Sequence, residues 1–366
     1  MNNEDFGFMR MAYGLAERAV GKASPNPYVG AVIVKDGVIV GSGFHEGPGR
    51  PHAEIAALKQ AGRRAEQATA YITLEPCVHW GRTPPCVDSL IEARLKRVVV
   101  SDLDPNPLVF KKGLGRLRRE GIKVEAGLLR DRNRKLNEVY LKYITHRVPF
   151  VALKAAVTLD GRMATRSFDS RWISSGVTRD YIHLLRGEYD ALMVGIKTIL
   201  RDNPRLTVRH PQRPNKSLIR VIIDSRLSLP PGAQVLKTLD RGKVLVFTRA
   251  DSSRRKAEAL ERAGARVVRV RGAGSRVDLR AVLARLGGND IAGVLVEGGG
   301  TLASALLQDR LADKVILTLS PKLVGGRNAP AFVAGEKGAS RLAEALTLKG
   351  VHSFALGSDI IVEGYL

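Results

Sequence analysis

The stretch HAEIAALKQAG at residues 52–62, followed by the loop PCVHWGRTPPC at 76–86, decides the fold of the first part of the chain. Apolar spacing in the first segment predicts a helix that opens at His52. The prolines that end the loop predict a second helix from Cys86. Residues 68–75, between them, alternate like a buried strand. This order predicts an α/β domain with one histidine and two cysteines at neighbouring strand-to-helix edges, where such sheets bind ligands.

The residue types at these edges are those of a zinc hydrolytic site. His52, Cys77 and Cys86 offer an imidazole and two thiolates, and three protein ligands leave the fourth position of Zn²⁺ to a water. A zinc-bound water ionises near neutral pH and can attack an amidine-like ring carbon. Glu54 is then expected to carry protons from the water to the ring nitrogen and the departing ammonia.

Two other interpretations of the cysteines remain open on the residues alone. His79 lies between Cys77 and Cys86 and could complete a structural zinc site as a fourth ligand. The cysteines could also be buried apolar residues that bind no metal.

Four motifs occur in an order that resembles the deaminase half of the bifunctional riboflavin-biosynthesis deaminase/reductase family. They are SPNPYVGAVIV at 24–34, HAE at 52–54, the cysteine loop at 76–86 and DPNP at 104–107. The eight residues between the cysteines exceed the tight PCxxC of nucleobase and tRNA deaminases and resemble the pyrimidine-nucleotide subgroup. The resemblance implies a cytidine-deaminase-like three-layer αβα domain. It also implies a substrate contact for Asn26, which could otherwise be a turn residue between prolines.

Two segments depart from the pattern of that family. Phe110-Lys111-Lys112 follows DPNP where the resemblance would place a small residue and a glycine. Val78 and Trp80 are bulkier and less polar than expected in the cysteine loop. The mouth of the site is therefore expected to differ from that of related proteins.

A domain boundary is expected just before Pro149, giving domains of residues 1–147 and 148–366. The first is expected to contain a hairpin turning at Asp36-Gly37 and a last helix near 133–145. After the boundary, apolar strands are predicted from residue 149 and at 191–195, 217–224, 243–248, 265–270, 293–296 and 314–319. Helical stretches lie between most of them, which predicts a second α/β domain. The RGAGSR segment at 271–276 is expected to be a loop.

LVEGGGTLASALL at 295–307 is an apolar strand that runs into glycines and then into a helix. Bare amides at such a helix start can bind phosphate. A Rossmann fingerprint would belong in the first βα turn of a domain, so we discount it here. A helix packed closely on a strand, with no ligand, remains the alternative.

The second half also resembles the same family, in its reductase part, which is similar to dihydrofolate reductase in fold and uses NADPH. The motifs are LKAAVTLDGRMA at 153–164, SRWIS at 170–174, DNPRLTVR at 202–209, VEGGGTL at 296–302 and SPKLVGG at 320–326. The resemblance implies NADPH contacts at Ala156, Trp172, Thr198, Asp202, Ser225, Gly299, Gly300, Thr301, Leu302, Ala303, Ser304 and Ala305. It implies substrate contacts at Ser170, Arg186, Leu206, Arg209 and Glu297.

The substrate contacts of Arg186 and Arg209 are chemically reasonable, because a planar guanidinium group can donate two hydrogen bonds to a phosphate. Taken singly, each residue also has an ordinary interpretation: Arg186 as a surface charge, Thr198 as a helix cap and Trp172 as core. No acid is assigned in the reductase site, although Asp202 and Glu297 are candidates.

The resemblance thus implies one chain with two activities and two cofactors, Zn²⁺ and NADPH. The first would deaminate 2,5-diamino-6-ribosylamino-4(3H)-pyrimidinone 5′-phosphate by hydrolysis. The second would reduce the ribosyl side chain of the product to ribityl, giving 5-amino-6-ribitylamino-uracil 5′-phosphate.

The charge is strongly basic, with 59 Lys and Arg against 36 Asp and Glu, a net +23. A deaminase of tRNA or single-stranded nucleic acid, or a zinc-stabilised nucleic-acid-binding module, would account for it. Both leave the second domain unexplained, and aromatic residues, at 5%, do not interleave with the charges. A basic surface that attracts phosphorylated substrates and an anionic dinucleotide is the interpretation we favour, with no nucleic-acid partner.

From the composition and the N-terminal sequence we expect a cytoplasmic protein. The 366 residues are enough for about two to three domains. Two cysteines used as metal ligands point to a reducing compartment. The N-terminus begins with Glu4 and Asp5 before an amphipathic pattern, unlike a signal peptide, and no apolar run suggests a membrane partner. The family resemblance implies a homo-oligomer, a dimer or higher.

Overall fold

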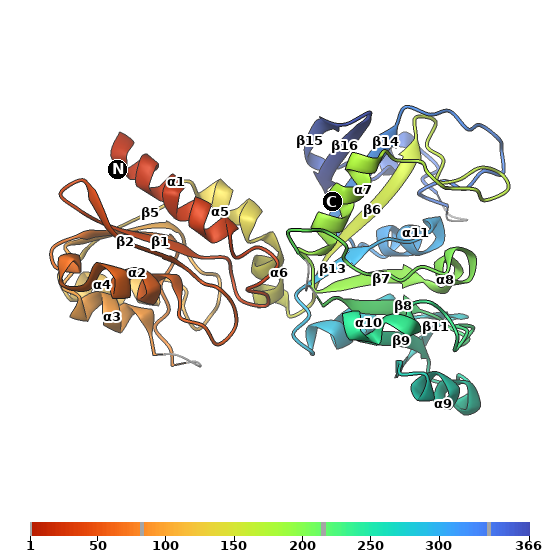
Figure 1. Ribbon diagram of the computed structural model, residues 1–366, viewed down its shortest axis with the longest axis horizontal. Coiled ribbons are helices and arrows are strands. Elements are labelled where there is room, and N and C mark those ends of the chain that lie inside the picture. The colour runs from red at the N-terminus through yellow and green to blue at the C-terminus, as the bar shows by residue number, and fades with distance from the viewer. Residues whose placement is uncertain (1, 81–83, 214–216, 335–337) are drawn as a thin grey trace. The chain divides into compact units, whose positions relative to one another are not determined.

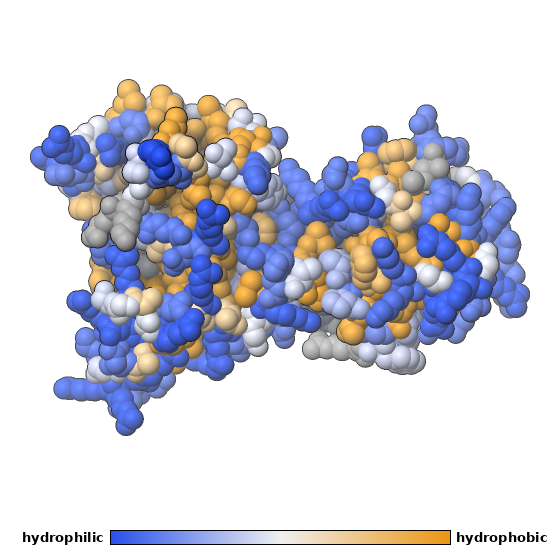
Figure 2. Space-filling model, turned by 180° about the vertical axis from the view of Figure 1, so that it is seen from behind, coloured by the Kyte–Doolittle hydropathy of each residue, from blue (hydrophilic) through white to orange (hydrophobic). Residues whose placement is uncertain are grey.

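The computed structural model describes residues 2–80, 84–213, 217–334 and 338–366. The chain divides into two compact units, Met1–Arg147 and Val148–Leu366, each built around its own sheet (Figure 1). Hydrophilic side chains are spread over both units on the face seen in Figure 2, with apolar patches between them. No helix within the described ranges is long and apolar enough to cross a membrane.

The first unit contains a five-stranded sheet in the order β2-β1-β3-β4-β5. Its strands are β1 (Gly30–Lys35), β2 (Val38–Phe44), β3 (Thr69–Leu74), β4 (Arg97–Asp102) and β5 (Lys123–Ala126). β3, β4 and β5 run parallel, whereas β1 is antiparallel to both of its neighbours. The predicted hairpin is confirmed: Asp36 and Gly37 have φ of 50° and 77°, as a primed two-residue turn requires.

Helices cover both faces of this sheet. They are α1 (Asn3–Glu17), α2 (Ala53–Ala61), α3 (Cys86–Glu92), α4 (Lys112–Arg119), α5 (Arg130–Leu136) and α6 (Glu138–His146), with a 3₁₀ turn at Gly62–Ala65. Figure 1 shows α1 and α5 on one side and α2, α3 and α4 on the other. Each side has its own apolar core, one around Met9 and Tyr13 and one around Ala57 and Leu90. The predicted three-layer αβα architecture is confirmed.

The single helix expected near 133–145 is wrong, because the structure has two helices that meet at Asn137. The buried Asn137 side chain accepts from the backbone amide of Tyr28 at 2.7 Å and donates to the carbonyl of Tyr28 at 3.1 Å. A side chain so committed to distant backbone breaks the regular helical path.

The Phe110-Lys111-Lys112 departure has a structural role at the start of α4. Lys111 adopts a left-handed conformation, with φ of 59°. Its backbone amide and that of Gly113 each donate to the Glu75 carboxylate, both at 3.0 Å. Glu75 therefore satisfies amides that the first turn of a helix leaves unpaired.

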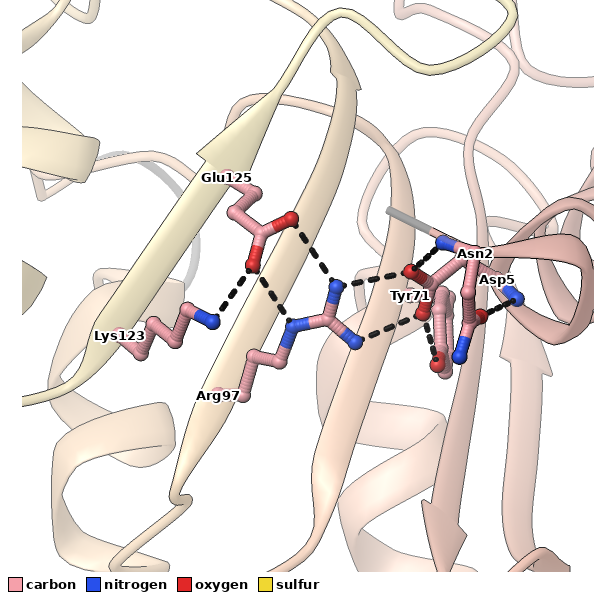
Figure 3. A network of polar contacts seen from close by, with 6 residues as sticks. All are labelled: Asn2, Asp5, Tyr71, Arg97, Lys123 and Glu125. Atoms are coloured by element: carbon pink, nitrogen blue, oxygen red, sulfur yellow. Dashed lines mark hydrogen bonds and ion pairs between the residues drawn. The ribbon is translucent and has the colours of Figure 1, made fainter.

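A charged network ties α1 to the sheet (Figure 3). The guanidinium of Arg97 on β4 lies between the carboxylates of Asp5 and Glu125, at 2.6 Å and 3.0 Å. Tyr71 donates to Asp5 at 2.7 Å, and Lys123 lies 3.2 Å from Glu125. Hydrogen bonds from Arg97 hold the pKa of Asp5 well below its usual range and that of Glu125 at about 2.

We expect acid to weaken this unit through the same network. Depressed native pKa values mean that the unfolded chain binds more protons, so stability is complete above about pH 5 and falls as the pH drops toward the native values. Asp5→Asn should lower the free energy of unfolding by about 1.5–3 kcal/mol at neutral pH and flatten its acid dependence. Urea unfolding at several pH values measures both; an unchanged acid slope in the variant would contradict the assignment.

The second unit contains a nine-stranded sheet in the order β10-β9-β8-β7-β13-β6-β14-β16-β15. Its strands are β6 (Phe150–Thr158), β7 (Ala191–Gly195), β8 (Ile219–Ile223), β9 (Val244–Arg249), β10 (Arg266–Val270), β13 (Gly293–Val296), β14 (Lys314–Ser320), β15 (Lys349–Leu356) and β16 (Asp359–Tyr365). The strands from β10 to β14 in this order are parallel, and β16 and β15 add an antiparallel edge. All the predicted strands are confirmed.

The helices of this unit are α7 (Gly176–Arg186), α8 (Ile196–Asp202), α9 (Arg254–Arg262), α10 (Leu279–Gly287) and α11 (Gly300–Gln308), with 3₁₀ turns at Leu236–Arg241 and Leu342–Glu344. The sequence did not lead us to predict the β15–β16 hairpin. The expectation of a plain loop at 271–276 is wrong, because β11 (Gly272–Ala273) pairs with β12 (Arg276–Val277). Gly274 lies in the turn between them with φ of 61°.

Candidate active sites

His52, Cys77 and Cys86 come together at one edge of the first sheet. His52 is the N-cap of α2, Cys86 opens α3, and Cys77 lies in the loop after β3. His52 Nδ1 lies 3.1 Å from Cys86 Sγ and 3.7 Å from Cys77 Sγ. The three candidate ligand atoms all lie within 4.8 Å of one another. His52 occupies the N-cap position of α2, one residue before the first turn, and its side chain makes no capping hydrogen bond.

The donor set fits zinc. One imidazole and two sulfurs are typical of a catalytic site with three protein ligands. The backbone amide of Cys86 donates to Cys77 Sγ at 3.3 Å, and a hydrogen bond from the Cys86 thiol lowers the pKa of Cys77. Within the part of the chain that the structure describes, the ligand group does not include His79. A structural site with His79 as fourth ligand is therefore not supported.

Glu54 lies in the first turn of α2, beside this cluster, with only 4% of its surface exposed. Burial raises the pKa of Glu54, and the nearby His52 opposes the rise. A carboxyl whose pKa is raised toward neutrality can both accept and donate a proton, as an acid-base residue must.

Asn26 is held by a residue that sequence reasoning missed, His45. His45 is buried, and its Nδ1 lies 3.1 Å from the carbonyl of Pro51. Because a carbonyl only accepts, His45 Nδ1 carries the proton and its Nε2 accepts from the Asn26 amide at 2.9 Å. The carbonyl oxygen of Asn26 is left to accept from a ligand. The signal in the sequence was a second histidine seven positions before His52.

The cysteine loop is described in part. Gly81, Arg82 and Thr83, which belong to the PCVHWGRTPPC loop at 76–86, lie outside the described residues. Val78 packs against the core below, and Trp80 is 75% exposed.

The second unit has a cavity of about 1140 Å³ at the carboxyl ends of its parallel strands. Its lining includes residues at or just after the ends of β7, β8 and β13, where open α/β sheets bind ligands. Of the predicted residues, it is lined by Ala156, Ser170, Trp172, Arg186, Thr198, Asp202, Arg209, Ser225, Glu297, Gly299, Gly300, Thr301, Leu302 and Ala305.

Three predicted residues face the protein interior instead. Ala303 belongs to the apolar core of the unit, and Ser304 accepts from the backbone amide of Ala334 at 2.8 Å. Leu206 is 5% exposed. In α11, residues at 301, 302 and 305 line the cavity while 303 and 304 point away, as helical periodicity requires.

Gly300, the first residue of α11, allows the backbone near Ala331 to approach the helix closely. A Cβ on Gly300 would lie 2.4 Å from the carbonyl oxygen of Ala331. Gly299 is the N-cap of α11, so the unpaired amides of the first turn open onto the cavity. Such amides favour an anionic ligand.

Arg186 and Glu297 form a largely buried ion pair inside the cavity, with 15% of each side chain exposed. Nε and Nη2 of Arg186 donate to the two carboxylate oxygens at 2.6 Å and 2.8 Å. Burial alone would raise the pKa of Glu297, but Arg186 and Lys154 outweigh it and hold the pKa at about 2. Glu297 therefore stays ionised and is not suited to donate a proton.

Asp202 and Trp172 lie at the rim of the cavity. Trp172 is 62% exposed and carries the guanidinium of Arg179 at 4.4 Å from its ring centroid, so it is not core. Burial raises the pKa of Asp202. Asp202 thus remains the better of the two candidate acids.

Two family models match the chain. "RibD C-terminal domain" matches residues 149–362, and "Cytidine and deoxycytidylate deaminase zinc-binding region" matches residues 2–102. The riboflavin biosynthesis protein RibD of Aquifex aeolicus is 40% identical over 98% of this chain and 97% of its own length. The chain belongs to the RibD family. It is a bifunctional riboflavin-biosynthesis enzyme with a zinc deaminase domain and an NADPH-dependent reductase domain.

Solved structures of RibD have the same fold. That of Acinetobacter baumannii RibD, form 1, has a TM-score of 0.87 and is 37% identical, covering 99% of this chain and 98% of its own. A Thermotoga maritima structure, a diaminohydroxyphosphoribosylaminopyrimidine deaminase/5-amino-6-(5-phosphoribosylamino)uracil reductase, has a TM-score of 0.86 and 35% identity over 99% and 98% of the two chains. The predicted fold class, with a cytidine-deaminase-like and a dihydrofolate-reductase-like domain, is confirmed.

Proposed function

We propose that the first unit removes the 2-amino group of 2,5-diamino-6-ribosylamino-4(3H)-pyrimidinone 5′-phosphate, and that the second reduces the ribosyl group of the product to ribityl. The observation that carries this proposal is the pairing of buried Glu54 with the His52, Cys77 and Cys86 cluster, in one chain with a reductase cavity. The name of the Thermotoga maritima relative supports the substrate class.

In the first unit, His52, Cys77 and Cys86 would hold zinc. The metal, when bound, lowers the pKa of a water so that hydroxide is available near neutral pH. Glu54 would accept the proton of the attacking water and pass it to the ring nitrogen and the leaving ammonia. The Asn26 carbonyl oxygen, fixed by His45, would accept from an N–H or O–H of the substrate.

In the second unit, the cavity residues would hold NADPH, which would supply the hydride needed to reduce C1′ of a ring-opened, imine-like form of the product. The unpaired amides at Gly299 and Gly300 would bind a phosphate of the dinucleotide. Arg186 fixes the Glu297 carboxylate as an ionised acceptor for substrate hydroxyls. Asp202 would act as the proton donor. Positioning then accounts for most of the rate of hydride transfer.

A nucleic-acid deaminase leaves the reductase cavity without a role, so we do not favour it. The proposed substrate and NADPH are both anionic, which agrees with a net charge of +23. A homo-oligomer and a cytoplasmic location stay predictions.

The test is an assay of both half-reactions on the purified protein. We expect about one zinc per chain, ammonia release from the diamino ribotide, and NADPH oxidation that depends on the deaminated ribotide. Removal of zinc by a chelator should abolish ammonia release and leave NADPH oxidation intact when deaminated ribotide is supplied. No turnover of either ribotide, together with tight and salt-sensitive RNA binding, would overturn the proposal.

A further inference from the structure

His183 on α7 lines the reductase cavity and has an unusual set of neighbours. Its Nδ1 lies 3.3 Å from the backbone amide of Arg209 and 3.4 Å from Arg186 Nη1. Its Nε2 lies 3.0 Å from Arg209 Nη2. All three neighbours are hydrogen-bond donors, because amides and guanidinium groups do not accept.

A neutral imidazole can accept at one nitrogen only, since the other carries the proton. Nδ1 faces two donors, one of them a backbone amide whose position the chain fixes. Nε2 faces a single donor, on the exposed side chain of Arg209, which can turn away without moving the backbone. Nδ1 is therefore the acceptor, and Nε2 carries the proton.

Among the residues that the structure describes, this assignment leaves two N–H groups, on His183 Nε2 and Arg209 Nη2, side by side at 3.0 Å with no acceptor between them. Two donors that converge in this way require an oxygen atom to satisfy both. An oxygen of an anion would remove the donor-donor contact and gain two hydrogen bonds, at least one of them charge-assisted.

Arg186, the other predicted substrate arginine, has little left to offer such an anion. Its Nε and Nη2 bind Glu297, and its Nη1 donates to the carbonyl of Thr207 at 3.1 Å and approaches His183. Of the three side chains that meet here, His183 and Arg209 therefore keep donors for such an anion.

We propose that His183 is a substrate-binding residue of the reductase site, and that its Nε2–H and the Arg209 guanidinium together hold an oxygen of the substrate's phosphate monoester. The proposal rests on the proposed function of the second unit. Through Nδ1, His183 also fixes the backbone of Arg209, so the same ring orders the segment that carries its partner.

The charges around His183 agree with an anionic ligand. Arg186 and Asp180 lie on the same helix, Arg209 approaches from the segment after α8, and Glu297 and Lys154 approach from β13 and β6. Burial, Arg186 and Arg209 lower the pKa of His183 to about 4, so the ring is neutral in the free protein at physiological pH. A neutral ring keeps one acceptor and one donor, as the arrangement requires.

The experiment compares His183→Phe with His183→Gln, which keeps an N–H near the Nε2 position. His352→Phe is the matched control, because His352 is exposed on β15. NADPH oxidation is measured with the full-length protein on deaminated ribotide and on the same compound without its phosphate, and the KM for NADPH is measured in parallel.

For His183→Phe we expect the KM for the ribotide to rise about 10- to 100-fold, the loss typical of a charge-assisted hydrogen bond, with kcat within about twofold. His183→Gln should recover most of this loss, and His352→Phe should match the wild type. With the dephosphorylated compound the His183→Phe variant and the wild type should have equal kcat/KM, since the cycle isolates the contact with the phosphate.

Two outcomes overturn the proposal. An equal loss on both compounds means that His183 does not act through the phosphate. A rise in the KM for NADPH alone assigns the two donors to the phosphate of the cofactor. Failure of the proposed function is a different result, because the wild type itself would then not turn over the ribotide.

Discussion

Glu54→Gln is expected to reduce ammonia release by about 10³-fold, the loss typical of a removed acid-base residue. Glutamine keeps the shape of the buried side chain but can neither accept nor return a proton. Glu54 is almost fully buried against the His52 and Cys86 side of the cluster, so no bulk water can replace it efficiently. Steady-state release of ammonia from the diamino ribotide measures the loss.

The same variant should retain its zinc, because Glu54 is not in the group of His52, Cys77 and Cys86. NADPH oxidation with deaminated ribotide should be unchanged. Cys77→Ser is the matched comparison, and it should lose both zinc and ammonia release. If Glu54→Gln loses zinc in parallel with activity, Glu54 holds the metal and the proton-transfer role is wrong.

Arg186→Met should lower kcat/KM of the reductase at least about 100-fold and the free energy of unfolding of the second unit by about 3–5 kcal/mol. Methionine removes both hydrogen bonds to Glu297 and leaves a carboxylate buried without its guanidinium partner. Ammonia release by the first unit should not change. Urea unfolding and NADPH oxidation measure the two effects.

The sign of the pH dependence tests the cause. Without Arg186, burial is expected to raise the pKa of Glu297, so the native state would bind more protons than the unfolded chain, and stability would fall as the pH rises. The deficit of Arg186→Met should therefore be larger at about pH 8 than at about pH 5. Arg186→Met combined with Glu297→Gln should recover much of the stability but not the activity. If the loss in free energy of unfolding does not change with pH, the loss arises from packing and not from the Glu297 carboxylate.

Local patterns in the sequence were sufficient for the zinc cluster. His52 and Cys86 each lie at a helix start that apolar spacing or prolines mark, and Cys77 follows a strand that alternates apolar and polar residues. β1 is antiparallel to both β2 and β3, so the carboxyl ends of β2 and β3, which lead to the ligands, lie at the same edge of the sheet. Each step depends on residues a few positions apart, which is the range over which periodicity and turn chemistry act.

Features that depend on contacts between residues far apart in the chain could not be predicted from the sequence. The break at Asn137 follows from bonds to Tyr28, 109 positions away. Ala303 and Ser304 face away from the cavity, as helical periodicity predicts. The family resemblance nevertheless assigned NADPH contacts to the whole segment 299–305.

The sequence by itself determined two α/β domains, the donor set for zinc, the carboxyl beside it and the family. The tertiary structure decided how the polar groups pair: Arg186 with Glu297, His183 with the backbone amide of Arg209, and Asn26 with His45. The physical reason is that a hydrogen bond depends on distance and direction in space, and the first and last of these pairs join different elements whose approach only the packed fold sets.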